Sequence, residues 1–174
     1  RSILKICKEL RQPFIRYERS IANVSNAFLI QKFSDLENYD LKNKSILLAV
    51  GVRHLQEALT CVRNSGANVY ARVLANPESI RKTLSSSIQK TNFAVLNPSA
   101  SSNGKIEKAL IRKWNITDVI CRQSGGRNEF LWHRICLSME INLWLLKRPS
   151  ELKNISSVHS YKKLIKRLKS INMT

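Results

Sequence analysis

One short segment restricts the fold of this chain more than any other. Residues 45–50, Ser-Ile-Leu-Leu-Ala-Val, form a continuous apolar run that ends at Gly51. An apolar run without polar alternation is typical of a strand that is buried on both faces. Such strands belong to parallel sheets, because helices cover both faces of those sheets. The run therefore predicts a buried strand of a parallel sheet.

Apolar strands and amphipathic helices alternate through residues 44–149. We predict strands at 45–50, 69–74, 93–96, 117–122 and 141–147, and helices at 53–64, 76–86, 103–114 and 128–138. Strands that alternate with helices through short loops build doubly wound sheets with right-handed crossovers. The predicted fold class is therefore α/β, a Rossmann-like parallel sheet flanked by helices.

The first forty residues have a different pattern. Apolar residues at helical spacing predict a helix that ends near Arg11, and strands are expected at 14–19 and 27–33. The chain begins at Arg1, inside the helical pattern, so we expect that an upstream part is missing. We predict that 1–40 is the C-terminal part of a truncated first α/β domain, 41–150 a second Rossmann-like domain and 151–174 a basic helical tail.

The charge of the chain is strongly positive. It has 30 Lys and Arg against 12 Asp and Glu, a formal net charge of +18. This excess favours anionic partners such as phosphates, polycarboxylates, nucleic acid or an anionic membrane surface, although many lysines can simply solvate the surface. A nucleic-acid-binding module is disfavoured, because only 7% of residues are aromatic and no nucleic-acid-binding motif is present. No apolar run is long enough to span a membrane, and we predict no membrane partner.

The four cysteines are widely spaced, at Cys7, Cys61, Cys121 and Cys136. No C-x-x-C pair occurs, and the histidines show no ligand spacing with the cysteines, so no metal site is predicted. Three of the four lie in apolar runs and are expected to be reduced core thiols. Reduced thiols predict a cytoplasmic setting.

The turn Ser124-Gly125-Gly126 lies between a predicted strand and a predicted helix. Such a junction leaves backbone N–H groups free at the start of a helix, where anions bind. Arg122 and Arg127 add positive charge on either side of the turn. This interpretation predicts an anion-binding turn; the alternative is that the two glycines only permit a tight turn.

Cations and small residues follow several of the predicted strands. Ligands of open α/β sheets bind beyond the carboxyl ends of the strands, and arginines there suit carboxylates and phosphates. The residues predicted to bind cofactor or substrate are Arg16, Arg19, Gly51, Arg53, Arg72, Arg122, Ser124, Gly125, Gly126 and Arg148. The alternative is that so basic a chain places cations everywhere. No G-x-G-x-x-G turn, phosphate loop or catalytic set is present, and no catalytic residue is predicted.

An ordered set of short segments resembles a known family. The segments are P-F-I-R-Y-E-R at 13–19, L-L-A-V-G-V-R-H-L at 47–55, A-R-V-L at 71–74, P-E-S-I at 77–80, E-K-A-L at 107–110, V-I-C-R-Q-S-G-G at 119–126 and L-L-K-R-P at 145–149. Together they resemble the C-terminal two-thirds of the precorrin-6A and cobalt-precorrin-6A reductases of cobalamin biosynthesis.

The resemblance implies an NADPH-dependent reduction of one C=C bond in a polycarboxylate tetrapyrrole, with two α/β domains around the ligands. It also implies that the residues predicted above match ligand-binding positions of the family. The family's N-terminal glycine-rich nucleotide turn is not in this sequence, and Arg122 stands where the family usually has Lys. The chain is therefore expected to be a fragment of the enzyme, or else a non-catalytic, inactive α/β anion-binding homologue.

Overall fold

The computed structural model describes residues 3–21, 26–97, 103–149 and 157–171. The chain forms two compact units: unit 1 comprises Arg1–Ala22 with Pro149–Thr174, and unit 2 comprises Asn23–Arg148. Unit 2 ends within two residues of the boundary predicted at 150, but it begins at Asn23 and not after residue 40, and the tail predicted as a separate part belongs to unit 1. The reason is that a strand at Phe28–Ile30 pairs within the main sheet, whereas the C-terminal tail groups with the first residues of the chain.

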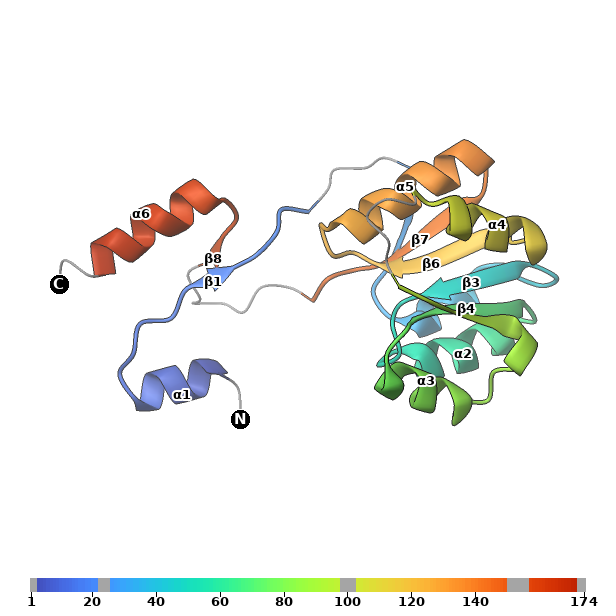
Figure 1. Ribbon diagram of the computed structural model, residues 1–174, viewed down its shortest axis with the longest axis horizontal. Helices are drawn as coiled ribbons and strands as arrows, with labels where there is room; N and C mark the ends of the chain where they lie inside the picture. The colour runs from blue at the N-terminus through green and yellow to red at the C-terminus, as the bar shows by residue number, and fades with distance from the viewer. Residues whose placement is uncertain (1–2, 22–25, 98–102, 150–156, 172–174) are drawn as a thin grey trace. The chain divides into compact units, whose positions relative to one another are not determined.

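The described strands of unit 2 form one six-stranded parallel sheet in the order β2-β7-β6-β3-β4-β5 (Figure 1). The strands are β2 Phe28–Ile30, β3 Ser45–Ala49, β4 Asn68–Leu74, β5 Phe93–Leu96, β6 Asp118–Arg122 and β7 Asn142–Leu146. All five strands predicted between residues 44 and 149 are present. The α/β, Rossmann-like fold class is confirmed.

Strand β3 is the predicted apolar run and lies in the interior of the sheet. It pairs with β4 on one side and with β6 on the other. The chain first builds the sheet outward from β3 through β4 and β5, and then crosses back to add β6 and β7. The point between β3 and β6, where this order reverses, is where doubly wound folds bind their ligands.

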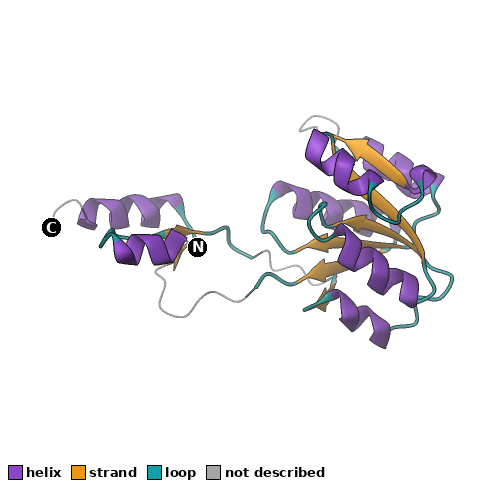
Figure 2. Cartoon of the chain, turned by 90° about the horizontal axis from the view of Figure 1, so that it is seen from below, coloured by secondary structure: helices purple, strands orange, loops and turns teal. Residues whose placement is uncertain are grey.

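Helices cover both faces of the sheet (Figure 2). On one face lie α2 Leu55–Asn64, α3 Pro77–Leu84 and the 3-10 helix η1 Phe33–Asn38; on the other lie α4 Lys105–Lys113 and α5 Arg127–Met139 (Figure 1). Successive residues of β3 serve the two faces, because Ile46 and Leu48 pack with α2 whereas Leu47 packs with α4 and α5. This double burial explains why the run has no polar alternation. A short 3-10 helix, η2 Lys90–Asn92, precedes β5.

The start of helix α3 is marked by the two residues that predicted it, Asn76 and Pro77. Asn76 precedes the helix and its side-chain oxygen accepts a hydrogen bond from the N–H of Ser79 at 2.8 Å. Pro77 occupies the first turn, where its missing N–H has no cost. The cap fixes where the chain leaves β4, and so fixes the loop at this end of the strand.

Unit 1 contains α1 Ile3–Glu9, β1 Arg16–Tyr17, β8 Ser157–Val158 and α6 Tyr161–Ile171. Strands β1 and β8 form a two-stranded parallel pair, each strand two residues long. The predicted basic tail helix corresponds to α6. Neither α1 nor α6 has a buried residue.

Candidate functional site

A cavity of about 250 Å³ lies at the carboxyl ends of three neighbouring strands, at the point where the strand order reverses. We name it the strand-end cavity. Its lining comes from the end of β3 at Ala49, Val50 and Gly51, from Arg72 and Leu74 of β4, from Cys121 and Arg122 of β6, and from Ser124, Asn128, Glu129 and Trp132. The last four belong to the turn after β6 and the first half of α5.

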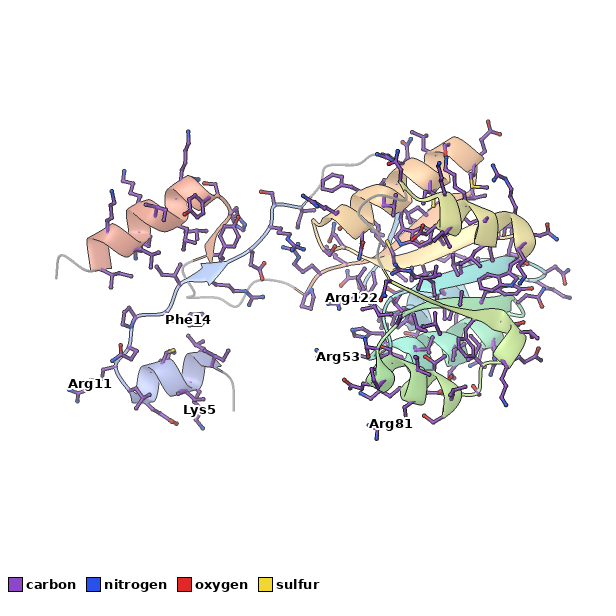
Figure 3. The ribbon with its side chains drawn as sticks, in the orientation of Figure 1. Lys5, Arg11, Phe14, Arg53, Arg81 and Arg122 are labelled. Carbon is purple, nitrogen blue, oxygen red and sulfur yellow. The ribbon has the colours of Figure 1, made fainter. Side chains whose placement is uncertain are left out.

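The structure brings together four of the predicted site residues in this cavity, namely Gly51, Arg72, Arg122 and Ser124. Gly51 has a φ of 81°, in the left-handed region that favours glycine, so the chain can turn sharply at the end of β3. Arg53 and Arg122 are exposed and lie on the same side of unit 2 (Figure 3).

The other predicted residues do not line the strand-end cavity. Arg53, Gly125, Gly126 and Arg148 each follow a strand of the sheet without lining the cavity, and the backbone N–H of Arg148 donates to Oε1 of Gln123 at 3.2 Å. Arg16 and Arg19 belong to unit 1. There the Nε of Arg16 donates to Oε1 of Glu18 at 2.6 Å.

Arg72 is the most buried cation of the cavity. Its side chain is only 10% exposed, and its Nη2 lies 3.7 Å from Oε1 of Glu107 on α4. Burial lowers the pKa of the Arg72 guanidinium, and the carboxylate of Glu107 partly opposes this change. Among the described residues, Nε of Arg72 has no hydrogen-bond partner. A buried guanidinium with an unused donor is suited to an anionic group.

The turn Ser124-Gly125-Gly126 differs from the prediction in one respect. Its backbone N–H groups are not free: those of Ser124 and Gly125 donate to Oε2 of Glu129, the latter at 2.6 Å, and that of Gly126 donates to Oγ of Ser124 at 3.3 Å. The expectation of free N–H groups at these three positions was wrong. The anion at this turn is the chain's own carboxylate, which caps the start of α5 from its third residue.

Sequence reasoning missed Asn128, Glu129 and Trp132, and it assigned Cys121 to the core only. One signal for Glu129 was available. An acidic residue three positions after the residue that precedes a helix is typical of a capping carboxylate, and Glu129 stands three positions after Gly126. Trp132 carried no such signal, because one aromatic residue in a helix is usually a core residue.

The cysteines differ in how deeply they are buried. All four cysteines are free, with Cys121 and Cys136 buried and Cys7 and Cys61 half-buried. Burial, and secondarily the carboxylate of Glu129, raises the pKa of Cys121. In the part of the chain that the structure describes, no group of three or more His, Cys, Asp or Glu could hold a metal ion. No helix in these same ranges is long and apolar enough to cross a membrane.

Fold and site together define a class: a doubly wound α/β protein with a cavity lined by two arginines at the switch point of its parallel sheet. Comparison with known families narrows this class. The sequence profile described as "Precorrin-6x reductase CbiJ/CobK" matches residues 1–169. The chain belongs to this family, as the resemblance implied.

Two relatives of the chain are named cobalt-precorrin-6A reductase. The chain is 26% identical over 157 residues to a cobalt-precorrin-6A reductase of Synechocystis sp., covering 87% of this chain and 59% of that protein. It is 28% identical over 134 residues to the enzyme of that name from Methanococcus maripaludis, covering 76% of this chain and 51% of that protein. The chain thus spans between half and three-fifths of these relatives. A solved structure titled "CobK precorrin-6A reductase" has the same fold, with a TM-score of 0.73 and 13% identity over 96% of this chain and 66% of that one.

Proposed function

We propose that this chain takes part in the reduction of a C=C bond in a precorrin-6A or cobalt-precorrin-6A macrocycle during cobalamin biosynthesis, as part of an NADPH-dependent oxidoreductase. Membership of the precorrin-6x reductase family supports the reaction. The names of the relatives support the substrate class. The observation that carries the proposal for these residues is the strand-end cavity, where Arg72 and Arg122 can meet the carboxylates of such a macrocycle.

The residues assigned to ligand binding are those predicted from the sequence, and the structure supports them unequally. Arg72 and Arg122 line the strand-end cavity and are proposed to bind substrate carboxylates. Gly51 and Ser124 shape its wall. Arg53 and Arg148 follow β3 and β7, and we keep them as candidates at the same edge. Arg16 and Arg19 of unit 1 remain candidates from the family motif alone.

The cofactor is proposed to be NADPH, because reduction of a C=C bond needs a hydride donor and nicotinamide cofactors supply hydride in proteins. The Ser124-Gly125-Gly126 turn does not fit the pyrophosphate of a dinucleotide, since its N–H groups already donate to a carboxylate of the chain. A phosphate there would lie beside the negative charge of Glu129. The exposed guanidinium group of Arg53 fits phosphate oxygens better and is proposed for that role.

A second function is favoured by this same observation. A turn that holds Glu129 in place of a ligand anion is compatible with a non-catalytic α/β homologue that binds an anionic ligand in the strand-end cavity. The two functions share the cavity and differ in whether a bound macrocycle is reduced.

Calorimetric titration of the whole chain tests the proposal. Precorrin-6A is titrated first, and NADPH separately. Arg122→Ala is expected to weaken precorrin-6A binding on the order of tenfold to a hundredfold, as loss of one charge-assisted contact would. Arg81→Ala on α3 is the matched control, because it removes the same charge from an exposed residue that does not line the cavity. Equal weakening by both variants would assign the effect to net charge and reject the site; binding without reduction in the presence of NADPH would favour the non-catalytic homologue.

A further inference from the structure

The carboxylate of Glu129 is used only in part by its capping role. The side chain is fully buried, and Oε2 alone accepts the backbone N–H groups of Ser124 and Gly125. In the described part of the chain, Oε1 has no hydrogen-bond partner. The capping role accounts for the burial of Oε2 but not for that of Oε1. A buried oxygen without a hydrogen-bond partner costs free energy, so its burial needs another explanation.

The imidazole of His133 faces this oxygen from one helical turn further along α5. Its Nε2 lies 3.7 Å from Oε1 of Glu129, and the His133 side chain is only 9% exposed. Nε2 also lacks a hydrogen-bond partner among the residues described. Two buried, unsatisfied groups that face each other at this distance need only a small movement to share a proton.

The two side chains line different cavities. Glu129 lines the strand-end cavity together with Arg72, Arg122 and Asn128. His133 lines a second cavity of about 290 Å³ together with Asn26, Arg134, Cys136, Leu137 and Glu140. We name this second space the α5 cavity. The pair therefore connects the candidate ligand site with a separate space on the same helix.

We propose that Glu129 and His133 form a proton-transfer pair, in which Glu129 delivers a proton to the ligand in the strand-end cavity and His133 replaces it. This inference rests on the proposed function, because reduction of a C=C bond adds a hydride to one carbon and a proton to its neighbour. The hydride comes from a reduced nicotinamide. In the proposed step His133 first passes a proton to the carboxylate of Glu129, and the carboxyl group so formed gives that proton to the second carbon and becomes a carboxylate again.

The surroundings of Glu129 suit this step. The two N–H groups of the turn stabilise the carboxylate that the transfer leaves behind. Water in the α5 cavity then returns to His133 the proton that it has given up. Cys121, which lines the same cavity as Glu129, does not compete as a proton donor, because its raised pKa makes the thiol a weaker acid. The other charged residues that line the strand-end cavity are Arg72 and Arg122, and those that line the α5 cavity are Arg134 and Glu140.

Glu129→Gln separates proton transfer from capping. The amide oxygen of Gln can still accept both N–H bonds of the turn, so the fold is expected to persist, but the group has no proton to give. The first measurement is the ¹⁵N chemical shift of His133 in the full chain at neutral pH. We expect Glu129→Gln to move it, and the matched control Glu57→Gln, on α2 over the opposite face of the sheet, to leave it unchanged. An equal, negligible effect of both variants would overturn the proposal.

Turnover gives the second measurement. With precorrin-6A and NADPH, Glu129→Gln is expected to lower the rate on the order of a hundredfold to ten-thousandfold, while precorrin-6A affinity stays within about threefold. His133→Ala is expected to lose on the order of tenfold or more and to recover when imidazole is added. A wild-type chain that reduces the macrocycle while Glu129→Gln does so equally fast would reject the proton pair and keep the proposed function. A wild-type chain that binds without reducing would reject the proposed function and with it proton delivery by the pair, and the ¹⁵N shift would then show only whether Glu129 and His133 interact.

Discussion

The two units of this chain differ in how many of their apolar residues are buried. In unit 2, apolar residues from six strands and from the helices on both faces fill two clusters. In unit 1, Val158 is the one buried apolar residue among those described, whereas Ile3, Leu10 and Tyr161 are 64–70% exposed. Parallel strands are stable when both faces of a sheet are covered, and a pair of two-residue strands provides little surface to cover. Unit 2 thus carries its own core, and unit 1 does not.

The largest difference between the units is expected in thiol chemistry. Burial, with a smaller effect of Asp118, raises the pKa of Cys136 in unit 2 to about 12. Because a raised pKa keeps the thiol protonated until the pH approaches it, about 10⁻⁴ of Cys136 is thiolate at pH 8. Cys7 in unit 1 is half-buried on a helix without a buried residue.

We therefore expect iodoacetamide at pH 8 to label Cys7 at least about a hundredfold faster than Cys121 or Cys136. Peptide mass spectrometry over time measures the rates, and labelling in denaturant, where all four cysteines react, is the control. Labelling of Cys136 at the rate of Cys7 in the folded chain would contradict the comparison.

The next largest effect is expected from removal of core volume. Leu48 of β3 is 1% exposed, and Leu48→Ala is expected to lower the free energy of unfolding by about 2–5 kcal/mol. Leu168 of α6 is 44% exposed, and the same change there is expected to cost less than about 1 kcal/mol. Urea denaturation followed by far-ultraviolet circular dichroism measures both, because the three tryptophans lie in unit 2 and would not report on α6. Similar costs at the two positions would mean that unit 1 buries α6 against a surface outside the described residues.

The loss of a carboxylate is expected to show a smaller difference in stability between the two units. Asp118 of β6 is buried and its Oδ1 accepts from Nε1 of Trp144 at 2.8 Å and from Nδ2 of Asn142 at 2.9 Å. Asp118→Ala leaves these donors unpaired and is expected to cost about 1–3 kcal/mol. In unit 1, Glu18→Gln weakens a partly exposed ion pair with Arg16 and is expected to cost less than about 1 kcal/mol. Thermal unfolding of both variants against the wild type checks the order.

The sequence predicted the sheet of unit 2 well, for a physical reason. Strands buried on both faces are apolar at most positions, and residues 46–50 are apolar without interruption. The edge strand β2 was found near its predicted range, but its partner could not be predicted. Pairing of Phe28 with Trp144 joins residues more than a hundred positions apart, and no local pattern encodes such a choice.

The candidate site was predicted only in outline. Arginines after strands could be placed at one edge, because parallel strands all end there. Whether a backbone N–H is free depends on which side chain reaches it, and the length of Glu129 lets it turn back onto Ser124 and Gly125. His133 likewise acquires its partner only when α5 forms. Side-chain pairing of this kind follows from the folded helix rather than from composition or charge.

The smallest effect is expected from the removal of unit 1. A chain limited to residues 23–148 keeps the six-stranded sheet, the helices on both faces and the strand-end cavity. Since almost all buried apolar residues lie in this range, we expect its midpoint of thermal unfolding to stay within about 4 °C of the full chain, the shift that about 1 kcal/mol produces in a domain of this size. Differential scanning calorimetry measures both chains, with Leu48→Ala in the short chain as the control for a true core transition. A fall of more than about 10 °C would show that unit 1 contributes several kcal/mol to unit 2 and would break the comparison. An unchanged midpoint would sharpen it, because unit 1 would then be free to serve a ligand or a partner without a part in stabilising the sheet.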